Sequence, residues 1–223
     1  MTVVSPSFRT RFRSSIEQPV AAVFARTGLS PNALTLIGFA IAIVGAWLAA
    51  NQSWLLAGLV VGFGAIFDLF DGALARATNR TSKFGAFMDS TFDRAGEAVV
   101  YVGIAIGLAD VGLNYGPQVA TVAMAAAFLV SYARAKSESL GFSSGSGMAN
   151  VGLAPREVRL AILVVGLVVA GYLVEPVRQF VPPWWMVLVG SLGLIAILAT
   201  ITTIQRILFV YRQSKSSNQE VTE

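Results

Sequence analysis

Residues 68–93 of this chain read DLFDGALARATNRTSKFGAFMDSTFD. The stretch contains four aspartates inside or beside two segments that are otherwise apolar enough to span a membrane: Asp68, Asp71, Asp89 and Asp93. A carboxylate in hydrocarbon costs at least ~2.5–3.5 kcal/mol, so an acid within a membrane segment indicates a functional site. Four acids so close together need cations to offset their charge.

The composition predicts an integral membrane protein. Of 223 residues, 55% are hydrophobic and 13% are charged, and the mean hydropathy is +0.69. A soluble domain usually has about 25% charged residues. The chain has no Cys and no His, which excludes disulfides and thiolate or imidazole metal sites. Any metal must therefore be held by oxygen, which favours Mg²⁺, Mn²⁺ or Ca²⁺ over zinc.

The hydropathy pattern predicts six membrane spans of about 20 residues each. These cover residues 33–50, 54–77, 84–109, 117–140, 157–176 and 183–210. Apolar residues before the first span recur every fourth position, which is typical of an amphipathic helix on a membrane surface: Phe8, Phe12, Ile16, Val20 and Phe24. Ser30 is a predicted N-cap, with Pro31 at the first helical position of the first span.

These patterns predict an all-α integral membrane protein with one membrane domain. We expect an interfacial amphipathic helix and turn over residues 1–30, six transmembrane helices over 31–213, and a polar disordered tail over 214–223. Arginine and lysine concentrate at the termini and in alternate loops, whereas the opposite loops contain only Arg178. The positive-inside rule then places both termini and the aspartate cluster on the cytoplasmic side of the plasma membrane.

The spacing of the aspartates predicts two facing carboxylate pairs. Asp68 and Asp71 are three residues apart and Asp89 and Asp93 are four apart, so each pair shares a helix face. We expect the second and third spans to form a helical hairpin that turns near residues 78–83 and holds the pairs at similar depth. Two divalent metals about 3.5–4 Å apart suit phosphoryl transfer. Without histidine, one aspartate less tied to metal is the natural general base.

The residues between the aspartates suit a phosphate ligand. Gly72 would let a phosphate approach the backbone, and Arg76 would pair with it bidentately. Gly85 lies one turn before Asp89 and leaves similar room. Structural ion pairs with Arg76 and Arg94 are the simpler alternative, and a divalent-cation transporter is a second one.

The fixed positions in this stretch match the signature D-x2-D-G-x2-A-R-x8-G-x3-D-x3-D. They are Asp68, Asp71, Gly72, Ala75, Arg76, Gly85, Asp89 and Asp93. The chain thus resembles the CDP-alcohol phosphotransferases. This resemblance implies a homodimeric membrane enzyme in which an alcohol attacks CDP-diacylglycerol and CMP is released. It also implies that the four aspartates bind two Mg²⁺ or Mn²⁺ ions and that Asp93 accepts the proton. The residues implied to contact the CDP-lipid are Pro31, Asn32, Ala33, Leu34, Gly72, Arg76, Ser82 and Gly85.

Within the family, the chain is most similar to the phosphatidylinositol phosphate synthases. That similarity implies a basic pocket for an acceptor phosphate, formed by Ser131, Arg134, Lys136, Arg156, Arg159 and Arg206. The order of Arg134 and Lys136 is reversed relative to the subgroup's usual pattern, and Arg and Lys bind phosphate with different geometry. Inositol phosphate is the expected acceptor, with glycerol 3-phosphate or another polyol phosphate as the alternative. The expected partners are these substrates, the bilayer and a second copy of the chain, and not nucleic acid.

Overall fold

The computed structural model describes residues 29–77, 82–142, 148, 151–174 and 184–220, with side chains except those of 69–77, 174 and 216–220. Over these residues the chain is helical and contains no strand. Its six helices are α2 (Pro31–Ala50), α3 (Trp54–Ala77), α4 (Lys83–Asp110), α5 (Gly116–Ser139), α6 (Arg156–Val174) and α7 (Trp184–Glu220). The predicted all-helical class is confirmed. The predicted N-terminal amphipathic helix lies outside the described residues.

Among the described helices, three are long and apolar enough to cross a membrane. They are Pro31–Ala50, Gly116–Ser139 and Trp184–Lys215, and Trp54–Asp68 is a shorter apolar helical stretch. Large apolar side chains stay exposed along these helices, for example Leu59, Leu129 and Ile197. Exposed apolar surface of this extent is typical of a protein that contacts lipid.

Local sequence signals explain where α2 and α4 begin. The Ser30 hydroxyl caps α2 by accepting a hydrogen bond from the Ala33 backbone N–H at 3.2 Å, and Pro31 follows at the first helical position. Ser82 caps α4 in the same way and accepts from the Gly85 N–H at 2.9 Å. The predicted cap at Ser30 is confirmed, because a hydroxyl at this position satisfies a backbone donor that the helix leaves unpaired.

Helix α7 ends later than the sequence predicts. Residues 214–220, expected in a disordered tail, continue the helix to Glu220. No Gly or Pro follows Gly193 up to that point, so nothing in the sequence interrupts the backbone hydrogen bonds. The Lys215 ammonium also lies 4.9 Å from the centre of the Tyr211 ring one turn earlier. The last predicted tail residues, 221–223, lie outside the described residues.

Helix α2 lies between α3 and α4 and packs against both. The predicted hairpin of α3 and α4 is therefore wrong as a packed unit, since in the described residues these two helices have no extensive contact with each other. Glycines of α4 allow α2 to pack closely against that helix. A side chain at Gly103 or Gly107 of α4 would collide with the backbone carbonyl of Ala46 or Ala49 of α2. Small residues let two helix backbones approach this closely.

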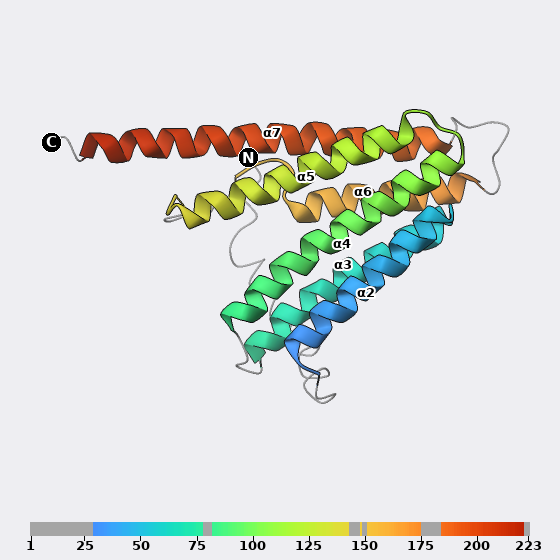
Figure 1. Cartoon of the computed structure of the whole chain (residues 1–223), viewed down its shortest axis with the longest axis horizontal. Coiled ribbons are helices and arrows are strands. Elements are labelled where there is room, and N and C mark those ends of the chain that lie inside the picture. Colours follow the sequence, from blue (N-terminus) through green and yellow to red (C-terminus); the bar gives the residue numbers. More distant parts are fainter. Residues whose placement is uncertain (1–28, 78–81, 143–147, 149–150, 175–183, 221–223) are drawn as a thin grey trace, which may run out of the picture.

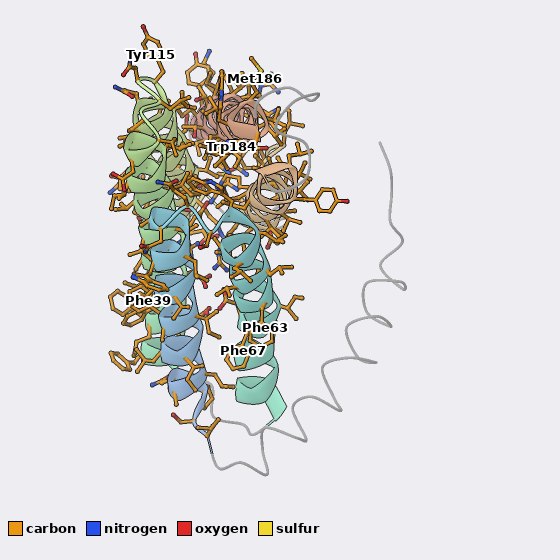
Figure 2. All side chains as sticks on the ribbon, turned by 90° about the vertical axis from the view of Figure 1, so that its right-hand side faces the viewer. Phe39, Phe63, Phe67, Tyr115, Trp184 and Met186 are labelled. Atoms are coloured by element: carbon orange, nitrogen blue, oxygen red, sulfur yellow. The ribbon has the colours of Figure 1, made fainter. Side chains whose placement is uncertain are left out.

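The helices form two groups that meet at one end and diverge at the other (Figure 1). Helices α2, α3 and α4 form one group and α5 and α7 the other, while α6 packs on both α3 and α7. The buried core joins the groups and contains Trp54, Tyr101, Ile104, Leu108, Leu163, Leu167, Leu188 and Leu192. Figure 2 views the molecule from the end where the helices meet, and shows Tyr115, Trp184 and Met186 there. The opposite end holds the first turns of α2, α4 and α6.

Candidate active site

Two of the predicted metal ligands come together with an arginine between α3, α4 and α6. Asp68 and Asp93 each contact Arg156, whose Nη2 lies 2.8 Å from Asp68 Oδ2 and whose Nη1 lies 3.0 Å from Asp93 Oδ2. All three side chains are about one-fifth exposed. Arg94 adds a longer contact to Asp93 at 3.4 Å. The structure thus brings carboxylates from α3 and α4 to one point, although each of these helices packs mainly against α2.

A cavity that is open to solvent lies beside this cluster between α2, α3, α4 and α6. Its polar lining consists of Thr35, Asp68, Asp93, Glu97 and Arg156, and the rest is apolar. Phe39 of α2 and Phe92 of α4 form one wall, with ring centres 5.1 Å apart. A mostly apolar cavity with a few convergent charged groups is typical of a ligand site.

A glycine on α2 makes room for the Asp68 carboxylate. A Cβ atom at Gly38 would lie 2.7 Å from Asp68 Oδ1, which is closer than real side chains approach. Gly38 is buried and lines the same cavity. The missing side chain therefore allows a charged oxygen of α3 to lie directly against the α2 backbone.

The donors at this site fit a hard divalent cation. Asp68 and Asp93 already share one positive group, the Arg156 guanidinium, and Asp89 lies one turn before Asp93 on α4. Among the residues whose side chains are described, no three such ligands gather in metal-binding geometry. The fourth predicted ligand, Asp71, lies on α3 beyond the described side chains, as do the neighbouring candidates Gly72 and Arg76. Carboxylate oxygens are the ligands that Mg²⁺ and Mn²⁺ prefer.

Three of the predicted CDP-lipid contacts meet at the first turns of α2 and α4. A Cβ atom at Gly85 would lie 3.2 Å from Asn32 Oδ1 and 3.1 Å from Ser82 Oγ. The missing side chain of Gly85 thus lets these two polar oxygens lie close to its backbone. Among the remaining α2 candidates, Leu34 is 1% exposed and belongs to the core, whereas Pro31 and Ala33 are half-buried.

The predicted acceptor-phosphate residues divide into two groups. Arg156 lies beside the carboxylates, and within the described part of the chain its buried Nε has no hydrogen-bond partner. Arg159 and Arg206 are buried and already paired. Arg159 forms a bidentate ion pair with Glu97, and Arg206 donates to the backbone carbonyls of Val151 and Val130. Of these three arginines, Arg156 is the partly exposed one that lines the cavity, whereas Arg159 and Arg206 are buried and bound to protein oxygens.

The α5 candidates lie on different faces of their helix. Ser131 and Arg134 are three residues apart and share a face, whereas Lys136 is exposed two positions beyond Arg134. Arg134 Nε pairs with Glu138 at 2.9 Å, and both side chains are about two-fifths exposed.

Known proteins confirm the resemblance seen in the signature. Residues 28–189 match the family model of the CDP-alcohol phosphatidyltransferases. This chain belongs to the CDP-alcohol phosphatidyltransferase family. The match spans α2 to α6 and the start of α7, and therefore includes every residue of the cavity lining.

Similar proteins within the family carry closely related names. The chain is 34% identical over 201 residues to an archaetidylinositol phosphate synthase of Pyrococcus horikoshii, covering 89% of this chain and 94% of the relative. It is 35% identical over 210 residues to a phosphatidylinositol phosphate synthase of Streptomyces avermitilis, covering 93% and 82%. The phosphatidylinositol phosphate synthase of Mycobacterium tuberculosis with CDP-DAG bound superposes with a TM-score of 0.74 at 29% identity, covering 88% and 94%. The same enzyme has been solved in complex with manganese and citrate, with a TM-score of 0.72.

Several residues of the site were not singled out by the signature. Glu97 carries a detectable signal, because it lies four residues after Asp93 and thus continues the acidic face of α4. Gly38 and Thr202 carry no such signal in the sequence. Gly38 matters only because α2 crosses Asp68, and Thr202 only because its hydroxyl accepts two backbone N–H groups from residues 153 and 154.

Proposed function

We propose that this member of the family transfers the phosphatidyl group of CDP-diacylglycerol to a hydroxyl of inositol phosphate. The products are phosphatidylinositol phosphate and CMP. The observation that carries the proposal is the convergence of Asp68, Asp93 and Arg156 on one cavity. Carboxylates and an adjacent arginine with an unpaired donor suit a reaction between two phosphate-bearing substrates.

The four aspartates are the metal ligands in this proposal. Asp68, Asp71, Asp89 and Asp93 would hold two Mg²⁺ or Mn²⁺ ions, which when bound supply neutralisation of the diphosphate charge. The manganese complex of the Mycobacterium tuberculosis enzyme supports this assignment. Gly38 holds open the space that the Asp68 carboxylate needs.

Asp93 acts as the general base. Its carboxylate takes the proton of the acceptor hydroxyl, and the hydroxyl oxygen attacks the β-phosphorus of CDP-diacylglycerol. A new P–O bond forms to the acceptor, and the bond from this phosphorus to the oxygen of the CMP phosphate breaks. That oxygen keeps the electron pair, so CMP leaves and the proton remains on Asp93. Arg156 orients the acceptor by donating to its phosphate.

The proposal includes an arrangement of the chain in the membrane. We infer six spans, a cytoplasmic active site at the end where the helices diverge, an interfacial helix over residues 1–30, and a homodimer. The acyl chains of the donor would stay in the bilayer while the nucleotide lies near Asn32, Ser82 and Gly85. The CDP-DAG complex of the structurally similar enzyme supports a lipid-linked nucleotide as donor.

A CMP-release assay with purified protein tests the proposed function. CDP-diacylglycerol is supplied with Mg²⁺ and one acceptor at a time: inositol phosphate, free inositol, glycerol 3-phosphate or serine. We expect release with inositol phosphate to exceed the others, and chelation of the metal by EDTA to abolish it. Preferential release with glycerol 3-phosphate would assign the acceptor to the alternative, and release with free inositol would remove the need for a phosphate-binding arginine.

A further inference from the structure

A second ion pair, between Glu97 and Arg159, lies one helical turn further along α4 and α6 than the pair of Asp93 and Arg156. Arg159 donates from Nε and Nη2 to the two carboxylate oxygens of Glu97 at 3.0 and 2.9 Å. Its Nη1 donates to the backbone carbonyl of Ala154 at 3.0 Å. The side chains are 1% and 4% exposed. Every nitrogen of this guanidinium is therefore engaged by protein oxygens.

Such a pair is a poor source of net stability. Removing two charges from water costs several kcal/mol per ion in real proteins, which offsets most of their mutual attraction. Its structural effect is more informative. A bidentate pair fixes both the distance and the relative rotation of the two groups that it joins. Here it joins α4 to α6 at a point next to the carboxylate cluster.

The two ion pairs lie next to each other and join the same two helices, α4 and α6. Glu97 follows Asp93 by four residues on α4, and Arg159 follows Arg156 by three on α6, so each helix presents its two charges on one face. Arg156 contacts Asp93 at 3.0 Å and Arg159 contacts Glu97 at 2.9 Å. A rotation of α6 that displaced Arg159 would displace Arg156 as well.

The segment that leads into α6 is fastened separately to α7. The Thr202 hydroxyl accepts from the backbone N–H groups of Leu153 and Ala154 at 3.1 and 2.9 Å. Arg206 Nε donates to the Val151 carbonyl at 3.0 Å. The Ala154 carbonyl in turn accepts from Arg159. The first turn of α6 is thus held from the segment before it as well as from α4.

We propose that Glu97 and Arg159 form a positioning pair that holds the Arg156 guanidinium at the acceptor-phosphate site and does not itself contact substrate. The inference rests on the proposed function, because it takes an acceptor phosphate to be the ligand of Arg156. In this proposal Arg159 supports the position of Arg156 and does not bind the acceptor phosphate itself. Arg156 remains the arginine of α6 that touches substrate.

The variant Glu97→Gln separates the two roles of Arg159. If Arg159 bound the phosphate itself, weakening its pairing with Glu97 would leave the acceptor KM unchanged or lower it. A positioning pair predicts the opposite. We expect the acceptor KM to rise by about tenfold or more, as for the loss of other supporting contacts around a site, while the KM for CDP-diacylglycerol stays within twofold.

A double-mutant cycle gives a second and independent test. Glu97→Leu with Arg159→Leu removes both charges together, which proteins tolerate far better than the loss of one. We expect this variant to bind CDP-diacylglycerol normally and to raise the acceptor KM. Adding Arg156→Gln should then increase it little further, because both changes remove the same contact. Arg212→Gln, at an exposed arginine of α7, is the matched control.

Three outcomes would overturn the positioning role. These are a lower acceptor KM in Glu97→Gln, additive effects of Arg156→Gln and the leucine pair, or an equal rise in both substrate KM values. The wild-type measurement keeps the two proposals apart. If wild-type protein releases no CMP with inositol phosphate, the proposed function fails. If it does and the cycle is additive, only the positioning role fails.

Discussion

Asp93 is the side chain on which the proposed chemistry depends most directly. Asp93→Asn keeps the shape of the residue but removes its ability to accept a proton. General-base catalysis contributes typically about 10²–10⁴-fold, so we expect turnover to fall by that factor. CDP-diacylglycerol binding should persist, since the asparagine oxygen still faces the cavity. CMP release and isothermal titration with the CDP-lipid measure the two effects, and substantial retained turnover would assign the base to another residue.

Gly38 controls the position of a second carboxylate without any functional group of its own. A methyl group there would lie 2.7 Å from Asp68 Oδ1 and must displace it. For Gly38→Ala we expect about 10–100-fold weaker Mn²⁺ binding, the usual cost of disturbing a ligand's support. Manganese titration followed by electron paramagnetic resonance measures this affinity directly. Gly193→Ala is the control, because nothing lies within 4 Å of its Cβ position; an equal loss there would show a general effect of alanine.

The Thr202 hydroxyl makes two of the hydrogen bonds that attach the α6 entry segment to α7. Thr202→Val keeps the shape of the side chain but leaves two backbone N–H groups without their acceptor. An unsatisfied buried donor costs about 1–3 kcal/mol, so we expect a loss of stability of that size and a higher acceptor KM. Unfolding in detergent and the CMP-release assay provide the measurements.

Two further variants complete the Thr202 experiment. Thr202→Ser should restore both properties, because it returns the hydroxyl. Thr200→Val is the matched control, since the exposed Thr200 hydroxyl donates only to the Ala196 carbonyl of its own helix. Wild-type behaviour of Thr202→Val would mean that the entry segment keeps its place without this contact.

The positions of the helices were predictable from the sequence, but which helices pack against one another was not. Hydropathy located the ends of the helices to within a few residues, except the C-terminal end of α7. An apolar run of sufficient length forms a helix in almost any membrane context. Helical spacing correctly placed Asp93 and Asp89 on one face. It could not reveal that α2 separates α3 from α4, because that depends on the backbone approach at Gly103.

The same limit applies to the buried arginines Arg159 and Arg206. Charge distribution marked Arg159 and Arg206 as cations near the cytoplasmic end, and that property suits either a ligand or a structural pair. The partners that decide between these roles are Glu97, 62 residues away in sequence, and the Val130 carbonyl, 76 residues away. Long-range pairing of this kind follows from helix packing and has no local signature.

At the scale of the whole molecule, the charge asymmetry predicts one orientation in the membrane. The two ends of α5 provide a direct test, because the chain has no native cysteine and single cysteines can be introduced without background. Asn114 lies just before the first residue of α5 and Ser139 is its last residue, and both are exposed. We expect Asn114→Cys to react with a membrane-impermeant maleimide from outside intact cells, and Ser139→Cys only in inverted vesicles.

The expected labelling pattern follows from the cost of moving cations across the bilayer. Arg134 and Lys136 lie in the last two turns of α5, and an arginine or lysine at the centre of a membrane helix costs about 2.5–3.5 kcal/mol. That cost favours keeping the Ser139 end, and with it the Asp68 and Asp93 carboxylates, on the cytoplasmic side where nucleotide-linked substrates are found. Labelling of both cysteines from one side would show that α5 does not cross the membrane, and the reversed pattern would place the catalytic cavity on the outer face.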